Sequence, residues 1–119
     1  MKIKYEFPES VQAANDGGVI TSITMTDLTM KMEELAAKTV RGTNSQTASM
    51  MALGYAFAKF AICGCDEKNI PQGGEESELL WARLSAKQRE LIVQAFTKDF
   101  RASEEEAEDF FGSKAVIQD

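Results

Sequence analysis

Histidine is absent from the 119 residues, and the chain has only two cysteines, two prolines and one tryptophan. Without histidine, the commonest general base and metal ligand is missing, and Ser-His and Cys-His nucleophiles are excluded. Cys63 and Cys65 stand one residue apart. Two cysteines are too few to hold zinc without histidine, so we expect no metal and no cofactor. We expect Cys63 to be a small core residue at a helix end.

Long apolar runs are also lacking. The most apolar stretch, residues 50–63, is interrupted by Gly54 and Lys59 and is too short to span a bilayer. Residues 1–10 alternate and lack the apolar core of a signal peptide, so we expect a cytoplasmic protein. The formal net charge of −6 argues against direct binding of nucleic acid and against an anionic membrane surface, since both favour Lys and Arg.

The residue pattern predicts one α+β domain over residues 1–112, with an N-terminal antiparallel β-hairpin followed by four to five α-helices, and a flexible tail over 113–119. Residues 2–7 alternate strictly and predict a half-buried strand. Residues 19–25 are rich in β-branched side chains and predict its partner, with Val19, Ile23 and Met25 on one face and a loose loop over 10–18.

Helices are expected from apolar spacing and from capping residues. Asp27 or Thr29 caps a helix over residues 30–40, and a second helix over 46–63 is apolar on most sides, which leaves self-association open. Breakers predict a loop over 64–74. Two capping boxes, Ser85 with Gln88 and Ser103 with Glu106, begin the last helices, which end near residue 101 and at Gly112.

The carboxylate side chains are the remaining candidates for catalytic groups. The acidic clusters at residues 75–78 and 104–109 lie where helices begin, so stabilisation of the helix dipole explains them better than catalysis. Residues 66–69 lack the spacing of a calcium loop. A carboxylate enzyme is therefore the third-ranked class, behind two classes of binding protein.

Methionine and aromatic side chains are the candidate contacts to a partner, because Met adapts to irregular surfaces and aromatic residues are frequent interface anchors. Met50 and Met51 are expected in the core. The predicted partner-binding residues are Met30, Met32, Tyr55, Phe57 and Trp81.

Three segments form a recognisable series: the Gly17-Gly18 turn with the strand at 19–25, the phrase Thr24-Met-Thr-Asp-Leu-Thr29 before a helix, and the run at 61–66 followed by Ile70-Pro71 and a Leu/Phe-rich helix at 84–100. Together they resemble small phage tail assembly chaperones. The resemblance implies a non-enzymatic role in virus tail assembly, in which the protein holds a tail tube or tape-measure protein in the host cytoplasm. The first strand and the acidic last helix depart from the usual form.

An acidic inhibitor is the alternative function. Such a phage-type protein would bind a host nucleic-acid-binding protein by imitating phosphates. The residues expected to do so are Glu104, Glu105, Glu106, Glu108 and Asp109.

Overall fold

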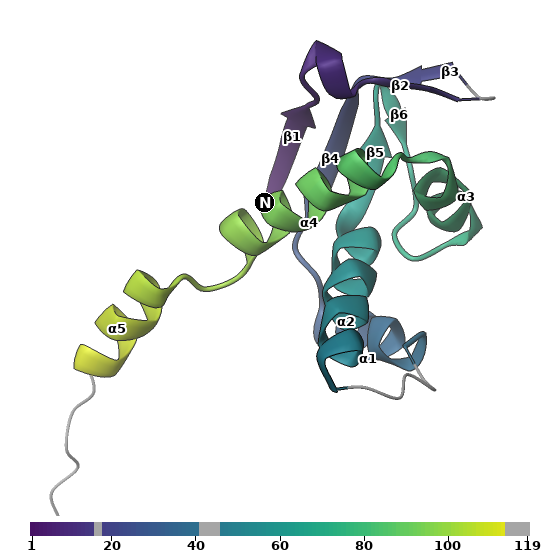
Figure 1. The fold of residues 1–119 in the computed structure, drawn as a ribbon. Helices are drawn as coiled ribbons and strands as arrows, with labels where there is room; N and C mark the ends of the chain where they lie inside the picture. The colour runs from purple at the N-terminus through teal and green to yellow at the C-terminus, as the bar shows by residue number, and fades with distance from the viewer. Residues whose placement is uncertain (16–17, 41–45, 114–119) are drawn as a thin grey trace, which may run out of the picture.

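The computed structural model describes residues 1–15, 18–40 and 46–113, with the side chains of 13–15 and 46–50 left out of the description. The predicted α+β fold is confirmed (Figure 1). The strands are β1 (Lys2–Glu6), β2 (Ala13–Asn15), β3 (Gly18–Ile20), β4 (Ser22–Thr26), β5 (Ile62–Cys65) and β6 (Lys68–Asn69). The helices are the 3-10 turn η1 (Glu9–Val11), α1 (Met30–Lys38), α2 (Gln46–Ala61), α3 (Glu75–Arg83), α4 (Ala86–Phe100) and α5 (Glu104–Gly112).

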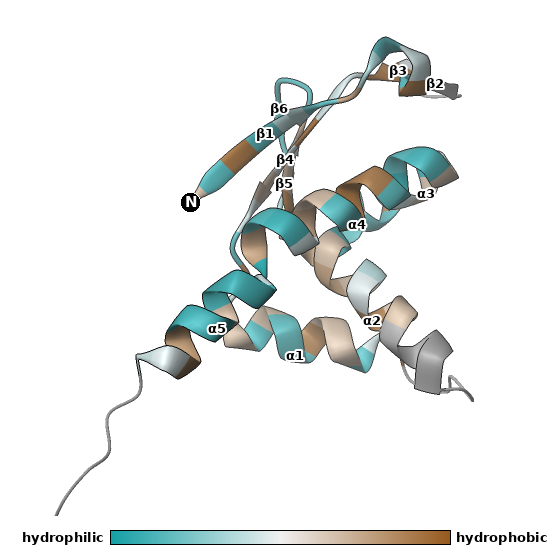
Figure 2. Ribbon diagram, turned by 60° about the vertical axis from the view of Figure 1, so that its left-hand side comes forward, coloured by the Kyte–Doolittle hydropathy of each residue, from teal (hydrophilic) through white to brown (hydrophobic). Residues whose placement is uncertain are grey.

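The predicted hairpin partners do pair. β1 lies antiparallel to β4, with Ile3 opposite Met25 and Tyr5 opposite Ile23. Successive side chains of a strand point to opposite faces, so the apolar residues of both strands meet the helices while Lys2 and Lys4 face away. Figure 2 shows this alternation along β1.

The second predicted strand is in fact two strands. β3 pairs antiparallel with β2 in a separate two-stranded sheet, and the chain leaves it at Thr21 to enter β4. Val19 therefore does not share the inner face of Ile23 and Met25, but is 50% exposed. The predicted loop over 10–18 contains β2 and the first residue of β3, while Asp16 and Gly17 lie outside the described residues.

The prediction for the end of the second helix was wrong. α2 stops at Ala61, and the next residues form the strand β5, so that the sheet has the order β1-β4-β5-β6. Ile62 lies opposite Met25, and Cys65 lies opposite Ile23. Cys63 is thus a half-buried strand residue and not the last residue of a helix. The predicted loop over 64–74 also contains β6.

Helices α2 and α4 cover one face of the sheet and enclose the core (Figure 1). The Tyr5 hydroxyl donates a hydrogen bond of 2.7 Å to Asp99, which joins β1 to α4. The core contains Phe7, Ile20, Ile23, Met25, Ala36, Ala56, Phe57, Ala58, Phe60, Ala61, Ile62, Ile70, Leu80, Leu84, Ile92 and Phe96.

Local capping explains where the helices begin. Thr29 accepts a hydrogen bond from the Met32 amide and caps α1, and both predicted capping boxes are present at α4 and α5. Residues 41–45, which were predicted to stop the first helix and cap the second, lie outside the described residues, as do 114–119 of the predicted tail. No helix in the described part of the chain is long and apolar enough to cross a membrane.

Candidate functional site

A wide groove lies between the β2–β3 hairpin, the β5–β6 turn and helix α3. Its volume is about 970 Å³, at the upper end of the range of small-molecule sites. Ile20, Ile70 and Leu80 are buried beneath it, while Val19 and Leu79 border it and are 50% and 61% exposed. The lining also includes Cys65, Asp66, Glu67, Lys68, Glu76, Ala82 and Arg83.

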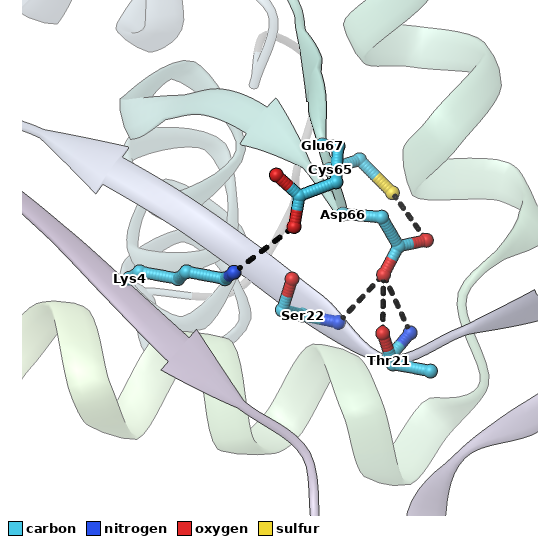
Figure 3. A network of polar contacts seen from close by, with 6 residues as sticks. All are labelled: Lys4, Thr21, Ser22, Cys65, Asp66 and Glu67. Atoms are coloured by element: carbon cyan, nitrogen blue, oxygen red, sulfur yellow. Dashed lines mark hydrogen bonds and ion pairs between the residues drawn. The ribbon is translucent and has the colours of Figure 1, made fainter.

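Asp66 lines one end of this groove. Its Oδ1 atom accepts hydrogen bonds from the backbone amides of Thr21 and Ser22, each 3.0 Å long, and from the Thr21 hydroxyl (Figure 3). Its own amide donates to the Ser22 carbonyl. The residue adopts φ +54°, which Asp tolerates better than most residues. One carboxylate therefore ties the β5–β6 turn to the connection between β3 and β4.

Hydrogen bonding and burial act in opposite directions on the two titratable groups at this turn. Burial alone would raise the pKa of Asp66, but the hydrogen bonds from Thr21 and Ser22 outweigh it and lower that pKa. Burial, together with the charge of Asp66, raises the pKa of the Cys65 thiol. The thiol therefore stays protonated at neutral pH and is a poor nucleophile. Among the described residues, no cluster of three or more Cys, Asp or Glu could hold a metal ion.

Helix α3 forms the other wall. Glu76, Leu79 and Arg83 follow helical spacing on the groove side, and Glu76 pairs with Lys68 across the groove at 3.4 Å. On the opposite side, the Ser77 hydroxyl donates to the Lys59 carbonyl, and Glu78 pairs with the Lys59 ammonium at 2.6 Å. These contacts hold α3 against α2.

Two of the predicted partner-binding residues come together elsewhere, on the α2 side of α3. The rings of Tyr55 and Trp81 meet edge to face, with centroids 6.2 Å apart. They border a hollow of about 210 Å³ that also includes Val40 and Lys59, which we call the aromatic hollow. Both residues are half-buried, so part of each side chain remains accessible to solvent.

The other predicted residues do not join this pair. Met30 is exposed at the start of α1, and Met32 is half-buried against the core. Phe57 is buried, and its ring lies beneath the Arg101 guanidinium at 5.2 Å, so it has no free surface for a partner.

The expected positions of the two adjacent methionines also need correction. Met51 is 60% exposed, because it lies one helical turn before Tyr55 on the outer side of α2, and not in the core as expected. Met50 lies outside the described side chains.

Sequence reasoning missed the groove as a whole. Two signals were available in the printed sequence: Val19 beside a glycine turn, and Leu79 one residue before the buried Leu80. The exposure of Val19 and Leu79 becomes predictable only when β3 is known to be a separate strand from β4 and residues 62–65 are known to form β5. The groove exists because of this break between β3 and β4 and because of β5.

No protein-family model matches the chain, and the comparisons with curated proteins and with solved structures found no similar protein.

Proposed function

We propose that the protein is a non-enzymatic binding factor that holds an apolar segment of another protein in the groove. We further propose that it acts in the manner of phage tail assembly chaperones, in the host cytoplasm, on a tail tube or tape-measure protein. The observation that carries the proposal is the groove itself, which has buried apolar side chains beneath it and two exposed ones at its border.

The physical chemistry of the groove suits a protein segment. Amphipathic helices bind by laying their apolar face into a hydrophobic groove, and the volume of about 970 Å³ leaves room for several side chains. Val19 and Leu79 expose apolar surface that a partner would cover, which is the usual source of binding free energy. The charges at the rim are of both signs, so they would orient a bound segment more than attract one.

The aromatic hollow is a second contact in this proposal. Tyr55 and Trp81 have the large, half-exposed rings that dominate many interfaces. Met51 extends the same side of α2 and adds an adaptable side chain. A partner chain that crosses α3 would reach the groove and the hollow together, because the two lie on opposite sides of this one helix.

The test is co-expression with the tape-measure protein of the same genome. The native chain should keep that protein in the soluble fraction, and Leu79→Glu should return it to the pellet because a charge at the border opposes apolar binding. Leu35→Glu is the matched control, since Leu35 is 43% exposed on α1 and lies outside the groove. Equal solubilisation by Leu79→Glu and the native chain would exclude the groove, and no solubilisation by the native chain would exclude the chaperone role.

One observation favours the alternative, an inhibitor of a basic nucleic-acid-binding protein. All five acidic residues of α5 are exposed on a helix that stands away from the body (Figure 1). Binding of this kind would weaken steeply as salt rises, whereas apolar binding in the groove would not. Charge reversal of all five acidic residues would abolish inhibition and leave chaperone activity largely intact; they are Glu104, Glu105, Glu106, Glu108 and Asp109.

A further inference from the structure

A second apolar pocket opens between strand β1 and helix α4, away from the groove. Its volume is about 190 Å³, and its lining is Tyr5, Glu6, Phe7, Pro8, Ile23, Met25, Leu91, Ile92 and Ala95. An apolar cavity of about 150 Å³ is enough to bind benzene. The pocket therefore has room for one phenyl ring.

Helix α5 carries two phenyl rings that the described residues do not cover. Phe110 and Phe111 are 72% and 64% exposed, and no residue of α5 is buried. Together with Ala107 they follow the i, i+3, i+4 spacing of one helix face, with Glu104 and Glu108 at its edge and Glu105 and Asp109 on the other side. The helix is thus amphipathic, with an acidic face and an aromatic face that both point into solvent.

Charge complementarity links this helix to the β1–α4 pocket. Lys87, Leu91 and Lys98 recur at i, i+4 and i+11 on α4, so two lysines flank the leucine that lines the pocket. Both lysines are exposed, and neither forms an ion pair with another described residue. A helix that inserted a phenyl ring beside Leu91 would bring the carboxylates flanking its aromatic face, Glu104 and Glu108, next to these ammonium groups.

The linker between α4 and α5 directs α5 away from its own pocket. Arg101 and Ser103 are both extended, at φ −117°, ψ 150° and φ −79°, ψ 166°. The Arg101 guanidinium lies over the Phe57 ring at 5.2 Å, which holds the start of the linker on α2. In this arrangement the pocket is left open to a phenyl ring from another copy of the chain.

We propose that two copies of the protein form a symmetric dimer by exchanging α5. The aromatic face of each helix inserts Phe110 or Phe111 into the β1–α4 pocket of the other copy, and the carboxylates that flank this face, Glu104 and Glu108, pair with Lys87 and Lys98. A two-fold exchange fills both pockets with the same contact, as closed dimers require. The dimer does not depend on the proposed function, because the groove and the aromatic hollow lie outside it.

The test measures mass against concentration by sedimentation equilibrium on the full chain. The native protein should be a dimer, and Phe110→Ala with Phe111→Ala should weaken dimerisation at least about tenfold, since burial of each ring contributes that much or more. Ala95→Leu, which fills the pocket from the other side, should do the same. Leu79→Ala is the matched control, because it removes an equally exposed apolar side chain from the groove and should leave the dimer unchanged.

The proposed ion pairs with Lys87 and Lys98 are tested by a double variant and a matched control. Lys87→Glu with Lys98→Glu should weaken the dimer, while Lys31→Glu with Lys38→Glu, which makes the same change of net charge on α1, should not. In a mixture of isotope-labelled and unlabelled copies, NOEs should connect the Phe110 and Phe111 rings of one copy to Leu91 and Ala95 of the other. A monomer at every concentration, a dimer indifferent to the Phe110, Phe111 and Ala95 changes, or ring contacts found only within one copy would each overturn the proposal.

Discussion

The carboxylate of Asp66 accepts three hydrogen bonds from Thr21 and Ser22, of which the two from backbone amides are 3.0 Å long. These residues are far apart in the sequence, and the contact joins the β5–β6 turn to the point where β3 gives way to β4. The shape of one end of the groove therefore depends on a single side chain.

Replacement of Asp66 should loosen this junction. Asp66→Ala leaves the Thr21 and Ser22 amides without their acceptor and should lower the free energy of unfolding by roughly 2 kcal/mol. Asp66→Asn keeps one acceptor oxygen, and Asn tolerates the positive φ, so this variant should lower the free energy of unfolding by about half as much. Urea unfolding followed by circular dichroism measures both, and an unchanged midpoint for Asp66→Ala would contradict the role assigned to the carboxylate.

The same carboxyl should make stability depend on pH. Its pKa in the folded protein lies below the ordinary value of 3.8, so the unfolded chain binds the proton more tightly than the folded one. The stabilisation is fully present well above that ordinary value and is lost as pH falls through it toward the folded pKa. Unfolding free energies of the native chain and Asp66→Asn, measured from about pH 6 to about pH 3, should therefore converge at the acid end.

Gly73 and Gly54 offer a matched pair of substitutions with opposite signs. Gly73 has φ +68°, and a Cβ there would lie 2.7 Å from the Phe60 ring, so Gly73→Ala should lower the free energy of unfolding by about 2–4 kcal/mol. Gly54 lies within α2, where a Cβ meets nothing within 4 Å, and Gly54→Ala should raise it by about 0.5–1 kcal/mol. Thermal unfolding of the two variants measures the difference.

Gln88 has two separable roles. Its side-chain oxygen accepts from the Ser85 amide in the capping box, while its side-chain nitrogen donates to the Ile20 carbonyl at 3.3 Å. Gln88→Glu keeps the first contact and loses the second, and it buries a charge beside a carbonyl oxygen. We expect a loss of about 2–3 kcal/mol near pH 7 that shrinks on acidification, as the carboxyl protonates.

The control for this change lies on the same helix. Gln94 is exposed, so Gln94→Glu makes the same chemical replacement in solvent and should leave the free energy of unfolding nearly unchanged. Equal losses for the two variants would show that net charge, and not the contact with Ile20, is responsible.

Local signals made much of the fold predictable. The strict alternation of residues 2–7, the capping boxes at Ser85 and Ser103, and the Thr29 cap depend on neighbours in the sequence, and each appears where it was expected. The pairing of β1 with β4 could be predicted because each half-buried strand requires a neighbouring strand to satisfy its backbone hydrogen bonds. These features are decided by contacts that the printed sequence displays directly.

Nonlocal contacts decided the rest. The apolar run that ends in Ile62 and Cys63 fits a buried helix or a buried strand equally well by periodicity, and only the free edge of β4 makes it a strand. Val19 resembles the apolar residues of β4 in sequence. The connection between β3 and β4, which Asp66 holds by hydrogen bonds, separates Val19 from them. The groove needs both of these features, whereas the contact of Tyr55 with Trp81 joins two residues that had been predicted separately.

Helix α2 runs into strand β5 with no connecting loop between Ala61 and Ile62 (Figure 1). A hinge requires residues whose backbone torsions can change without breaking paired hydrogen bonds, and this junction supplies none, because the ladder to β4 begins with Ile62. The helix that carries Tyr55 is therefore joined to the central strands of the sheet without a hinge, so a partner bound at the aromatic hollow would contact a segment continuous with the sheet.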